Sequence, residues 1–483
     1  MNYLLRRNYY EGIPSVKANP LRLITVLALL TAAPALAQQQ PITIPRNSPL
    51  AGGVPSGTAT PGPITLTIID AVSRSLQHNL GVLMAEQDTN AASAERAMAL
   101  SRMLPNVNGS ITEARRKTNL EAFGFPLGPD FPRVVGPYNV FDARVFLSQA
   151  IFDANASNQA SAAAHRVEAA KHSYKEMRSL VMLASANTYL QALASQARSA
   201  AAEAQLASSQ AIHQQALDLR SSGIVAGLDV VRAEVRVTSD RQRATAAAND
   251  AQIAKLNLAR LIGLPIGQEF TLVDRIPLVP DEAITLQQAL DAAYAHREDY
   301  QAALEQQKAA ESMRKAAAGE MLPAVHVNAD FGAIGLTVGS SLPTFNLMGT
   351  VDVPIFNGGR TRGRIAQATA DLQRRTNEVE DLKARVYYDV RSAFLDLESS
   401  RQQFEAASRG TELAAQQLQQ SRDRFAAGVA NNIEVIQAQE AVATATEQSI
   451  SAQYGFSVAK ALLAQSIGNA EEALLKAVQG QKP

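Results

Sequence analysis

The segment RFAAGVANNIEVIQAQ, residues 424–439, interrupts a long helical pattern at one glycine, Gly428. A second segment, LRSSGIVAGLDVVRAE at 219–234, does the same at Gly223. In both segments the next acidic residue stands six positions after the glycine. A glycine at the C-terminus of a helix readily adopts the left-handed conformation that ends the helix. The two segments therefore predict two helical hairpins of the same design.

Both hairpins lie in a unit that occurs twice along the 483-residue chain. Four other motifs recur in the same order, at offsets of 204 to 220 residues: ITLTIIDAVSRSLQHN with ITLQQALDAAYAHRED, MLPNVNGSI with MLPAVHVNA, AIFD with PIFN, and RLIGLP with QSIGNA. Constant order and spacing indicate one architecture used twice rather than a solenoid of short repeats. We expect a first structural repeat at 64–275 and a second at 276–468.

Each repeat is predicted to contain the same succession of elements. A helix of about 35 residues comes first and ends at a Leu-Pro pair, because proline cannot continue a helix. Two strands and a very long helix follow. The long helices are expected at 155–221 and 361–427, and the final helices at 229–262 and 433–467. A long helix of this size spans roughly 100 Å, so both shorter helices can stack end to end beside it.

Apolar residues in the second long helix recur every seven positions, which is typical of a coiled coil. Ile365, Leu372, Val379 and Val386 define one seven-residue grid, and Val390 begins a second grid shifted by four residues. Many of the remaining positions are alanine. Small residues on a second face allow one helix to pack against two neighbours, so we expect a sheet or cylinder of helices.

Four strands are expected, near 106–117, 141–152, 324–334 and 348–356. Polar and apolar residues alternate in the last three strands and alternate poorly in the first. Strands of about ten residues with this period are typical of transmembrane strands, although a soluble amphipathic hairpin has the same alternation. Four strands cannot close a barrel, and a membrane strand cannot leave an edge unpaired. Membrane strands would therefore require several chains to share one barrel.

The first 37 residues have the pattern of a secretory signal peptide. Basic residues precede an apolar run at 23–30, and a small-x-small sequence, ALA, ends at position 37. The apolar run is too short for a full membrane span. Residues 38–63 are rich in Pro and Gly and are expected to form an extended linker, and 469–483 form a C-terminal tail. The predicted destination is the periplasm, the cell exterior or an outer membrane.

Composition excludes several classes of function. The formal net charge is zero, so no basic field for a nucleic acid is predicted, and the absence of cysteine excludes disulfides and thiolate metal sites. His165 and His172 stand seven residues apart on one predicted helix face, which we interpret as solvated. No metal-ligand set, catalytic triad or phosphate loop is recognisable. We therefore predict neither an enzyme nor a bound cofactor or metal.

A strand-to-helix turn precedes each long helix. Glycine supplies the unusual backbone dihedrals of such a turn, and a polar side chain caps the helix that follows. We expect Asn357 or Thr361 to cap the second long helix. The residues of the two turns are Asp153 and Asn155 in the first repeat and Asn357, Gly358 and Gly359 in the second.

With these motifs in this order, residues 64 to about 468 resemble the TolC-like outer-membrane efflux protein family. The resemblance rests on the duplication, on the Leu-Pro pair before each strand segment, on VPIFNGGRTRGRI at 353–365, and on the segment at 424–439. It implies a mixed, mainly α fold. In a homotrimer, long coiled-coil helices form an α-barrel across the periplasm, and four strands per chain contribute to a shared 12-stranded transmembrane β-barrel.

The resemblance also implies a function. The chain would be the outer-membrane exit duct of a tripartite efflux or type I secretion system. It would passively conduct substrates from an inner-membrane pump (RND, ABC or similar) and a periplasmic adaptor protein to the exterior. Outer-membrane lipid would surround its barrel, and no nucleic acid would be bound. A soluble periplasmic coiled-coil adaptor or scaffold is the alternative, and the paired strand segments argue against it.

Site residues follow from the same resemblance, position by position. The turns between the helices would form the periplasmic tip that contacts the adaptor: Gly223, Ile224, Val225, Ala226, Gly428, Val429 and Ala430. Four residues beyond the turns are candidates for a gate: Asp229, Arg232, Glu434 and Gln437. The arginine of the family's gating network has no counterpart, because alanine stands at position 430. Arg232, one turn after Asp229, is an alternative basic partner.

Overall fold

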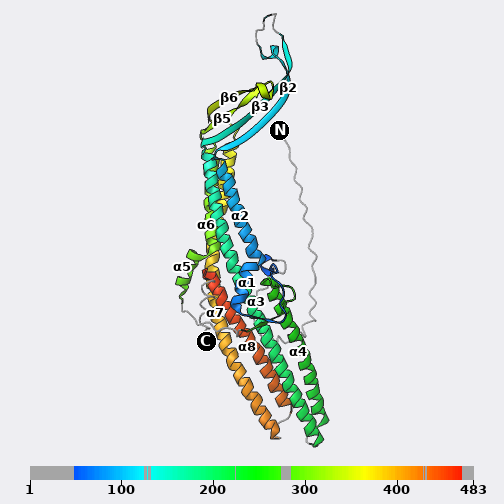
Figure 1. Ribbon diagram of the computed structural model, residues 1–483. Coiled ribbons are helices and arrows are strands. Elements are labelled where there is room, and N and C mark those ends of the chain that lie inside the picture. The colour runs from blue at the N-terminus through cyan, green and yellow to red at the C-terminus, as the bar shows by residue number, and fades with distance from the viewer. Residues whose placement is uncertain are drawn as a thin grey trace, which may run out of the picture. The chain divides into compact units, whose positions relative to one another are not determined.

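The computed structural model describes residues 48–124, 128, 132–223, 225–273, 284–427, 429 and 432–469. These residues all belong to one compact unit. The expected signal peptide, the first part of the expected linker and nearly all of the C-terminal tail lie outside the described residues. Figure 1 shows long helices with a sheet at one end and helix tips at the other.

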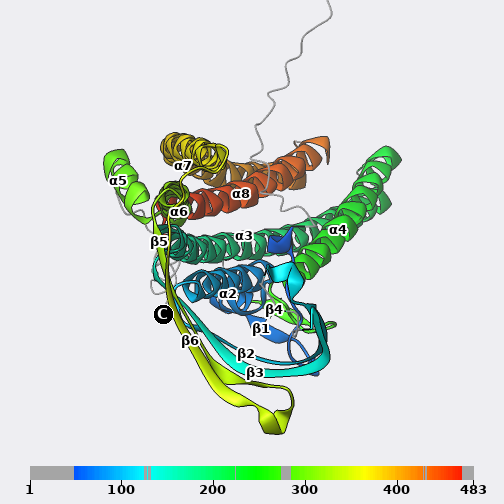
Figure 2. The same cartoon turned by 90° about the horizontal axis from the view of Figure 1, so that it is seen from above.

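The sheet has four antiparallel strands in the order β2-β3-β5-β6. The strands are β2 (Asn106–Asn119), β3 (Val134–Phe152), β5 (Ala324–Gly335) and β6 (Leu342–Asp352). Each repeat supplies one hairpin, and the central pairing of β3 with β5 joins the two repeats. Seen along the helices, the sheet curves, and β2 and β6 are its two edges (Figure 2).

The register divides the sheet into a polar and an apolar face, because directly paired residues share a face. Arg144 lies opposite Ser110 and Gly332, and Asp330 lies opposite Asn346. The other face carries exposed apolar side chains from all four strands: Val107, Ile111, Val145, Phe331, Phe345, Leu347 and Val351. The strand β2 follows this division at Val107 and Ile111 only, because Glu113 and Arg115 further along lie on the apolar face. Phe146 of β3 is an apolar residue on the polar face, opposite Asp330. One face of the sheet therefore suits water and the other suits lipid.

Two very long helices leave the sheet and return through shorter ones. The long helices are α3 (Ala154–Ser221), with 68 residues, and α7 (Arg360–Ala426), with 67. Each packs against the helix that follows it, α3 against α4 (Gly227–Leu261) and α7 against α8 (Asn432–Ile467). Among the residues that the structure describes, no helix is both long and apolar enough to cross a membrane.

The helix expected before each strand pair is divided into two helices, so the prediction of one helix of about 35 residues is wrong. The first repeat has α1 (Ile68–His78) and α2 (Leu80–Ser101), and the second has α5 (Leu286–His296) and α6 (Glu298–Gly319). The breaks fall at Asn79 and Arg297, whose backbones are extended, with ψ of 132° and 115°.

Distant partners explain both breaks. The Asn79 side chain accepts a hydrogen bond from the Gly81 amide and donates to the carbonyls of Leu50 and Leu261, at 3.0 and 3.3 Å. Arg297 is only 7% exposed and forms ion pairs with Asp299 and Asp389. Because an unpaired buried polar group is costly, these contacts stabilise the extended residue against a continuous helix.

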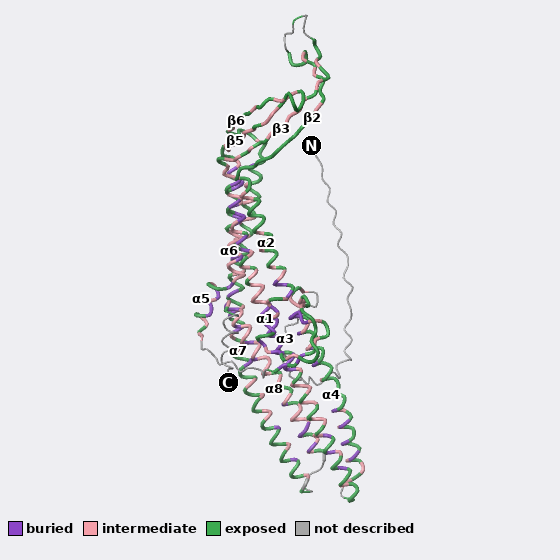
Figure 3. The backbone as a smooth tube through the Cα atoms, viewed as in Figure 1, coloured by how far each residue is buried: buried purple, intermediate pink, exposed green. Residues whose placement is uncertain are grey.

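The apolar core lies midway along the helices, where purple segments concentrate in Figure 3. In the first repeat it includes the parallel pair β1 (Ile64–Leu66) and β4 (Phe270–Leu272) and the fully buried Tyr189, whose hydroxyl donates to the Leu66 carbonyl. In the second it includes Val386 and Val390, the residues at which the seven-residue grid shifts. Among the residues described, three short 3-10 helices are also present, at Pro49–Ala51, Glu121–Phe123 and Val338–Ser340.

Candidate functional site at the helix tips

The first tip joins α3 to α4. Gly223 has a φ of +73° and nothing crowds its α-carbon, so it ends the long helix in the left-handed conformation that the sequence predicted. Ala226 precedes α4 without a side-chain cap, Val225 is half-buried and Ala226 is exposed. Ile224, also predicted to contact an adaptor, lies outside the described residues.

The second tip joins α7 to α8. Gly428 and Ala430 lie outside the described residues, and Val429 is exposed. The Val429 amide donates to the Arg424 carbonyl, five residues earlier, at 3.0 Å, a spacing typical of the turn that ends a helix. An apolar side chain is therefore presented at this tip.

The candidate gate residues form ion pairs within their own hairpins. Asp229 lies 3.3 Å from Arg232, one helical turn along α4, so the structure brings these two predicted residues together. Glu434 lies 3.1 Å from Arg424 of α7, a basic partner that the sequence analysis passed over. Gln437 is exposed. A carboxylate in each hairpin thus has an arginine partner near its tip.

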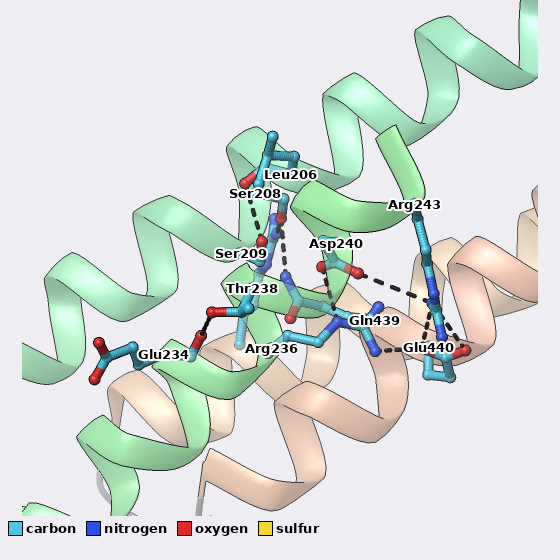
Figure 4. Close-up of polar contacts among 11 residues, drawn as sticks. Leu206, Ser208, Ser209, Glu234, Arg236, Thr238, Asp240, Arg243, Gln439 and Glu440 are labelled. Atoms are coloured by element: carbon cyan, nitrogen blue, oxygen red, sulfur yellow. Dashed lines mark hydrogen bonds and ion pairs between the residues drawn. The ribbon is translucent and has the colours of Figure 1, made fainter. Parts of the chain in front are cut away.

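Further from the tips, a polar network that is buried at Arg236 and Asp240 and open to solvent at Arg243 and Glu440 joins α4 to α8 (Figure 4). The Arg236 side chain donates to Asp240 of its own helix at 2.8 Å and to Glu440 of α8. Arg243 reaches the same Glu440 carboxylate at 3.1 Å. Asp240 is 1% exposed and the Arg236 side chain 11% exposed. This network is a direct charged link between the two hairpins.

Arg236 and Glu440, the two residues that join the helices, favour their charged forms. Burial would lower the pKa of Arg236, but hydrogen bonds to Glu440 and Asp240 outweigh it and raise the pKa. Burial would raise the pKa of Glu440, but hydrogen bonds from Arg243 and Arg236 outweigh it and lower the pKa. The link is therefore fully charged near neutral pH.

The sequence analysis missed this network, although one signal for it was present. Arg236, Asp240 and Arg243 are spaced by four and three residues, which places them on one face of a helix. Their partner on α8 is 204 residues from Arg236, and the spacing does not reveal it.

Polar contacts also join the two hairpins where α3 packs against α8. Gln439 is fully buried, and its amide donates to the Ser208 hydroxyl at 3.0 Å, which also accepts from Arg422. The Gln439 side-chain oxygen has no hydrogen-bond partner in the described part of the chain. Closer to the core, Arg198 pairs with Glu447, and Tyr454 donates to Asn187. The hairpins meet through polar groups that are only partly satisfied.

The two strand-to-helix turns begin their long helices in different ways. The Asp153 carboxylate accepts from the Ala156 amide at 3.0 Å and caps α3, whereas Asn155 donates to the Ala316 carbonyl of α6. In the second repeat, Gly358 and Gly359 have φ of +63° and +86°, and Gly359 occupies the capping position.

The expectation that Asn357 or Thr361 caps α7 is wrong. No side chain caps this helix, because the residue at the capping position is a glycine in the left-handed conformation. The Asn357 amide instead donates to the Thr361 hydroxyl, which donates to Glu320 of α6.

The two histidines interpreted as solvated are paired instead, so that interpretation is wrong. His165 lies 2.8 Å from Glu305, and His172 contacts Glu298, both on α6 of the other repeat. Within the described ranges no group of three or more His, Cys, Asp or Glu side chains could hold a metal ion. The absence of a metal or cofactor stays a prediction.

Comparison with known proteins is consistent with this architecture. A sequence profile described as "Outer membrane efflux protein" matches residues 71–264 and 289–469, one segment in each repeat. The curated protein "Pyoverdine export outer membrane protein OpmQ" of Pseudomonas putida KT2440 is 25% identical over 306 residues. That match covers 60% of this chain and 62% of the relative, so it spans less than two thirds of the relative's length.

Solved structures share the fold at low sequence identity. A membrane protein from Pseudomonas aeruginosa has a TM-score of 0.73 at 19% identity, covering 83% of this chain and 93% of that one. The open state of the MtrE outer membrane channel from Neisseria gonorrhoeae has a TM-score of 0.72 at 16% identity, covering 86% and 95%. The predicted fold class, long coiled-coil helices in a duplicated unit with four strands per chain, is confirmed.

Proposed function

Because the chain belongs to the outer membrane efflux protein family, we propose that it is the exit duct of a tripartite efflux or type I secretion system. The family confirms the predicted resemblance and the outer-membrane location with an extension into the periplasm. The duct passively conducts what an inner-membrane pump and a periplasmic adaptor deliver to it. It performs no chemistry on its cargo.

The observation that carries this proposal is the four-stranded sheet at the end of helices of roughly 100 Å. One face is apolar and exposed and the other is polar, as a barrel wall between lipid and water requires. Its edge strands β2 and β6 must find partners in a membrane, where an unpaired edge is not tolerated. Three copies would pair these edges and form a shared 12-stranded barrel.

The helix tips fit the adaptor end of such a duct. The turns at Gly223 and near Val429 lie at the far end from the sheet and present small or apolar residues. We assign the adaptor contact to these turns, together with Ile224, Gly428 and Ala430 by their place in the sequence. The pump is of RND, ABC or similar type, and the choice of cargo belongs to the pump.

The gate is assigned to the acidic residues beyond the turns. Asp229 and Glu434 each pair with an arginine in the same hairpin, and Arg236 ties the hairpins together one level further from the tips. Separation of the hairpins would have to break the charged link at Arg236. The ion pairs near the tips then determine the charge of the narrow entrance. Arg232 and Arg424 supply the positive charge that an arginine at position 430 would supply in the family's gating network.

Fractionation tests the duct against its alternative, a soluble periplasmic coiled-coil adaptor or scaffold. The full chain should sediment with outer membranes and run as a trimer in mild detergent. Recovery as a soluble periplasmic monomer would overturn the proposal, because an amphipathic sheet without neighbours could not stay in a membrane.

Single-channel recording tests the gate. Replacing both Asp229→Ala and Glu434→Ala removes the two carboxylates and frees their arginine partners, so conductance in a planar bilayer should rise. The matched control is Glu380→Ala, an exposed acid on α7 away from the tips, which should leave conductance unchanged. If the double variant and the control behave alike in conductance and ion selectivity, the gate is elsewhere.

A further inference from the structure

The polar face of the sheet carries a cluster of three charged side chains where β3 pairs with β5. Arg144 of β3 donates from Nε to Asp142, two residues earlier on the same strand, at 2.7 Å. It also donates from Nη1 to Asp330 of β5 at 2.6 Å. The side chains of Arg144, Asp142 and Asp330 are 18%, 28% and 15% exposed. One guanidinium thus holds two carboxylates, one from each repeat.

The strand β5 leaves room for this contact at Gly332, which lies directly opposite Arg144. A β-carbon at Gly332 would lie 2.2 Å from the β-carbon of Arg144 and 2.4 Å from the carbonyl oxygen of Ala143. Both separations are far shorter than a van der Waals contact, so a side chain at position 332 would push the strands apart. The glycine therefore allows Arg144 to reach Asp330, which lies one row of paired residues away on the same face.

The cluster supplies all the charge in the central part of the polar face. Four rows of paired residues cross this part of the sheet, beginning at the even-numbered residues 106–112 of β2. The structure describes every residue of these rows, and their only charged residues on this face are Asp142, Arg144 and Asp330. Asp352 of β6 lies nearer the helices, outside these rows. Because one positive charge stands against two negative charges, each chain leaves one carboxylate uncompensated here.

We propose that Arg144 determines the ion selectivity of the barrel by neutralising one of the two carboxylates that it holds. The inference rests on the proposed duct, in which the polar face lines the water-filled lumen. Three chains would place three copies of the cluster at one level of the shared barrel. The uncompensated carboxylates would then form a ring, and a ring of fixed negative charge attracts cations and repels anions. Cations are thus favoured within the membrane, independently of the acidic residues at the tips.

Dissolved salt limits the range of this effect. The screening length is about 30 Å at 0.01 M ionic strength and about 3 Å at 1 M. The ring therefore acts across the lumen in dilute salt, whereas in concentrated salt it acts only on ions close to the wall. The preference for cations should accordingly be large in dilute salt and nearly absent at high concentration.

Reversal potentials of the full-length channel in a planar bilayer, under a gradient of dilute potassium chloride, test the proposal. The natural chain should pass potassium in preference to chloride. Arg144→Met leaves two uncompensated carboxylates per chain and should raise the ratio of potassium to chloride permeability. Asp142→Asn leaves none and should lower the ratio. Asp142→Asn combined with Asp330→Asn leaves only the arginine charge and should lower the ratio further.

Glu113→Gln is the matched control. Glu113 lies opposite Phe141 on the other face of the sheet, one residue beyond the last of the four rows, so its loss should leave the permeability ratio unchanged. If Arg144→Met assembles poorly, the two asparagine variants, which keep the shape of the side chains, decide alone. A natural chain that forms no channel would contradict the proposed duct. Channels whose ratio stays constant across the series, or changes equally in Glu113→Gln, would overturn the role of Arg144.

Discussion

Besides the pairing of β3 with β5, two helical contacts join the two repeats, and they differ in chemistry. Toward the sheet, the centre of the α3–α6 contact consists of small buried residues such as Ala162, Ala163, Ala309 and Ala316. The histidine–glutamate pairs described above lie in the same contact, with partly exposed side chains. Gly319 brings the two backbones close enough that a β-carbon would lie 2.9 Å from the backbone of Ala154. Toward the tips, α3 and α4 meet α8 through charged and amide side chains. We call these the sheet-side contact and the tip-side contact.

The difference between the sheet-side and tip-side contacts indicates which part of the molecule can move. Small residues in close contact leave no room for rearrangement, because interiors at this density resist changes of even one methylene. A polar contact can exchange its partners for water when it opens, and this one has a buried amide oxygen without a protein partner. Motion about the sheet-side contact is therefore expected to open the tip-side contact.

The largest effect on the free energy of unfolding is expected when the tip-side contact loses Arg236, its central cation. Arg236→Met leaves Asp240, which is 1% exposed, buried without its main partner. Removing one member of a buried pair costs about 3 kcal/mol. Chemical denaturation followed by circular dichroism measures the free energy of unfolding. Arg243→Met is the control, because Arg243 is half exposed and exposed pairs contribute less than about 1 kcal/mol. Equal losses in both variants would contradict a buried link.

A smaller effect is expected when the sheet-side contact is overfilled. Gly319→Ala places a methyl group against backbone atoms that cannot swing away, which costs about 1–3 kcal/mol. The control is Gly363→Ala on α7, where nothing lies near the added carbon, and there the change should slightly stabilise the helix. Thermal unfolding of the two variants compares them. A tolerated Gly319→Ala would mean that the sheet-side contact is loose.

The smallest effect is expected in the response to acid. The pKa of Glu440 is lowered from 4.5, so its contribution to the tip-side contact is present above that pH and is lost as pH falls below it. The pKa of Glu305 at the sheet-side contact is lowered as well, so this contact weakens in acid independently. Hydrogen exchange along α8 should show acid opening that Glu440→Gln removes, while acid opening along α6 persists. Loss of both responses in Glu440→Gln would contradict two separate contacts.

The sequence predicted the features that repeat and missed those that depend on a single distant partner. A helical pattern that ends at a glycine predicted both long helices to within two residues, and in the second of them Val379, Val386 and Val390 are buried as the seven-residue grid requires. The placement of Val107 and Ile111 of β2 on the apolar face required the register of β2 with β3. Asn79 interrupts a good helical pattern because its amide bonds a carbonyl 182 residues away.

The sequence predicted where the residues of the candidate site lie better than it predicted which residues they contact. Gly223 and the pair of Asp229 with Arg232 follow from local spacing. The pairing of Glu434 with Arg424 joins two helices across a turn, and the histidine partners lie on the other repeat. Spacing along one helix shows which side chains share a face, but it does not show which element packs against that face.

The two helix breaks show how a duplicated unit diverges. At the same place in the two repeats, one break is held by the neutral amide of Asn79 and the other by the charged Arg297. Loss of the Arg297 side chain would leave the carboxylates of Asp299 and Asp389 without this partner, whereas loss of the Asn79 amide would leave only neutral carbonyls unpaired. The two halves of one chain are therefore expected to tolerate mutation at this place differently.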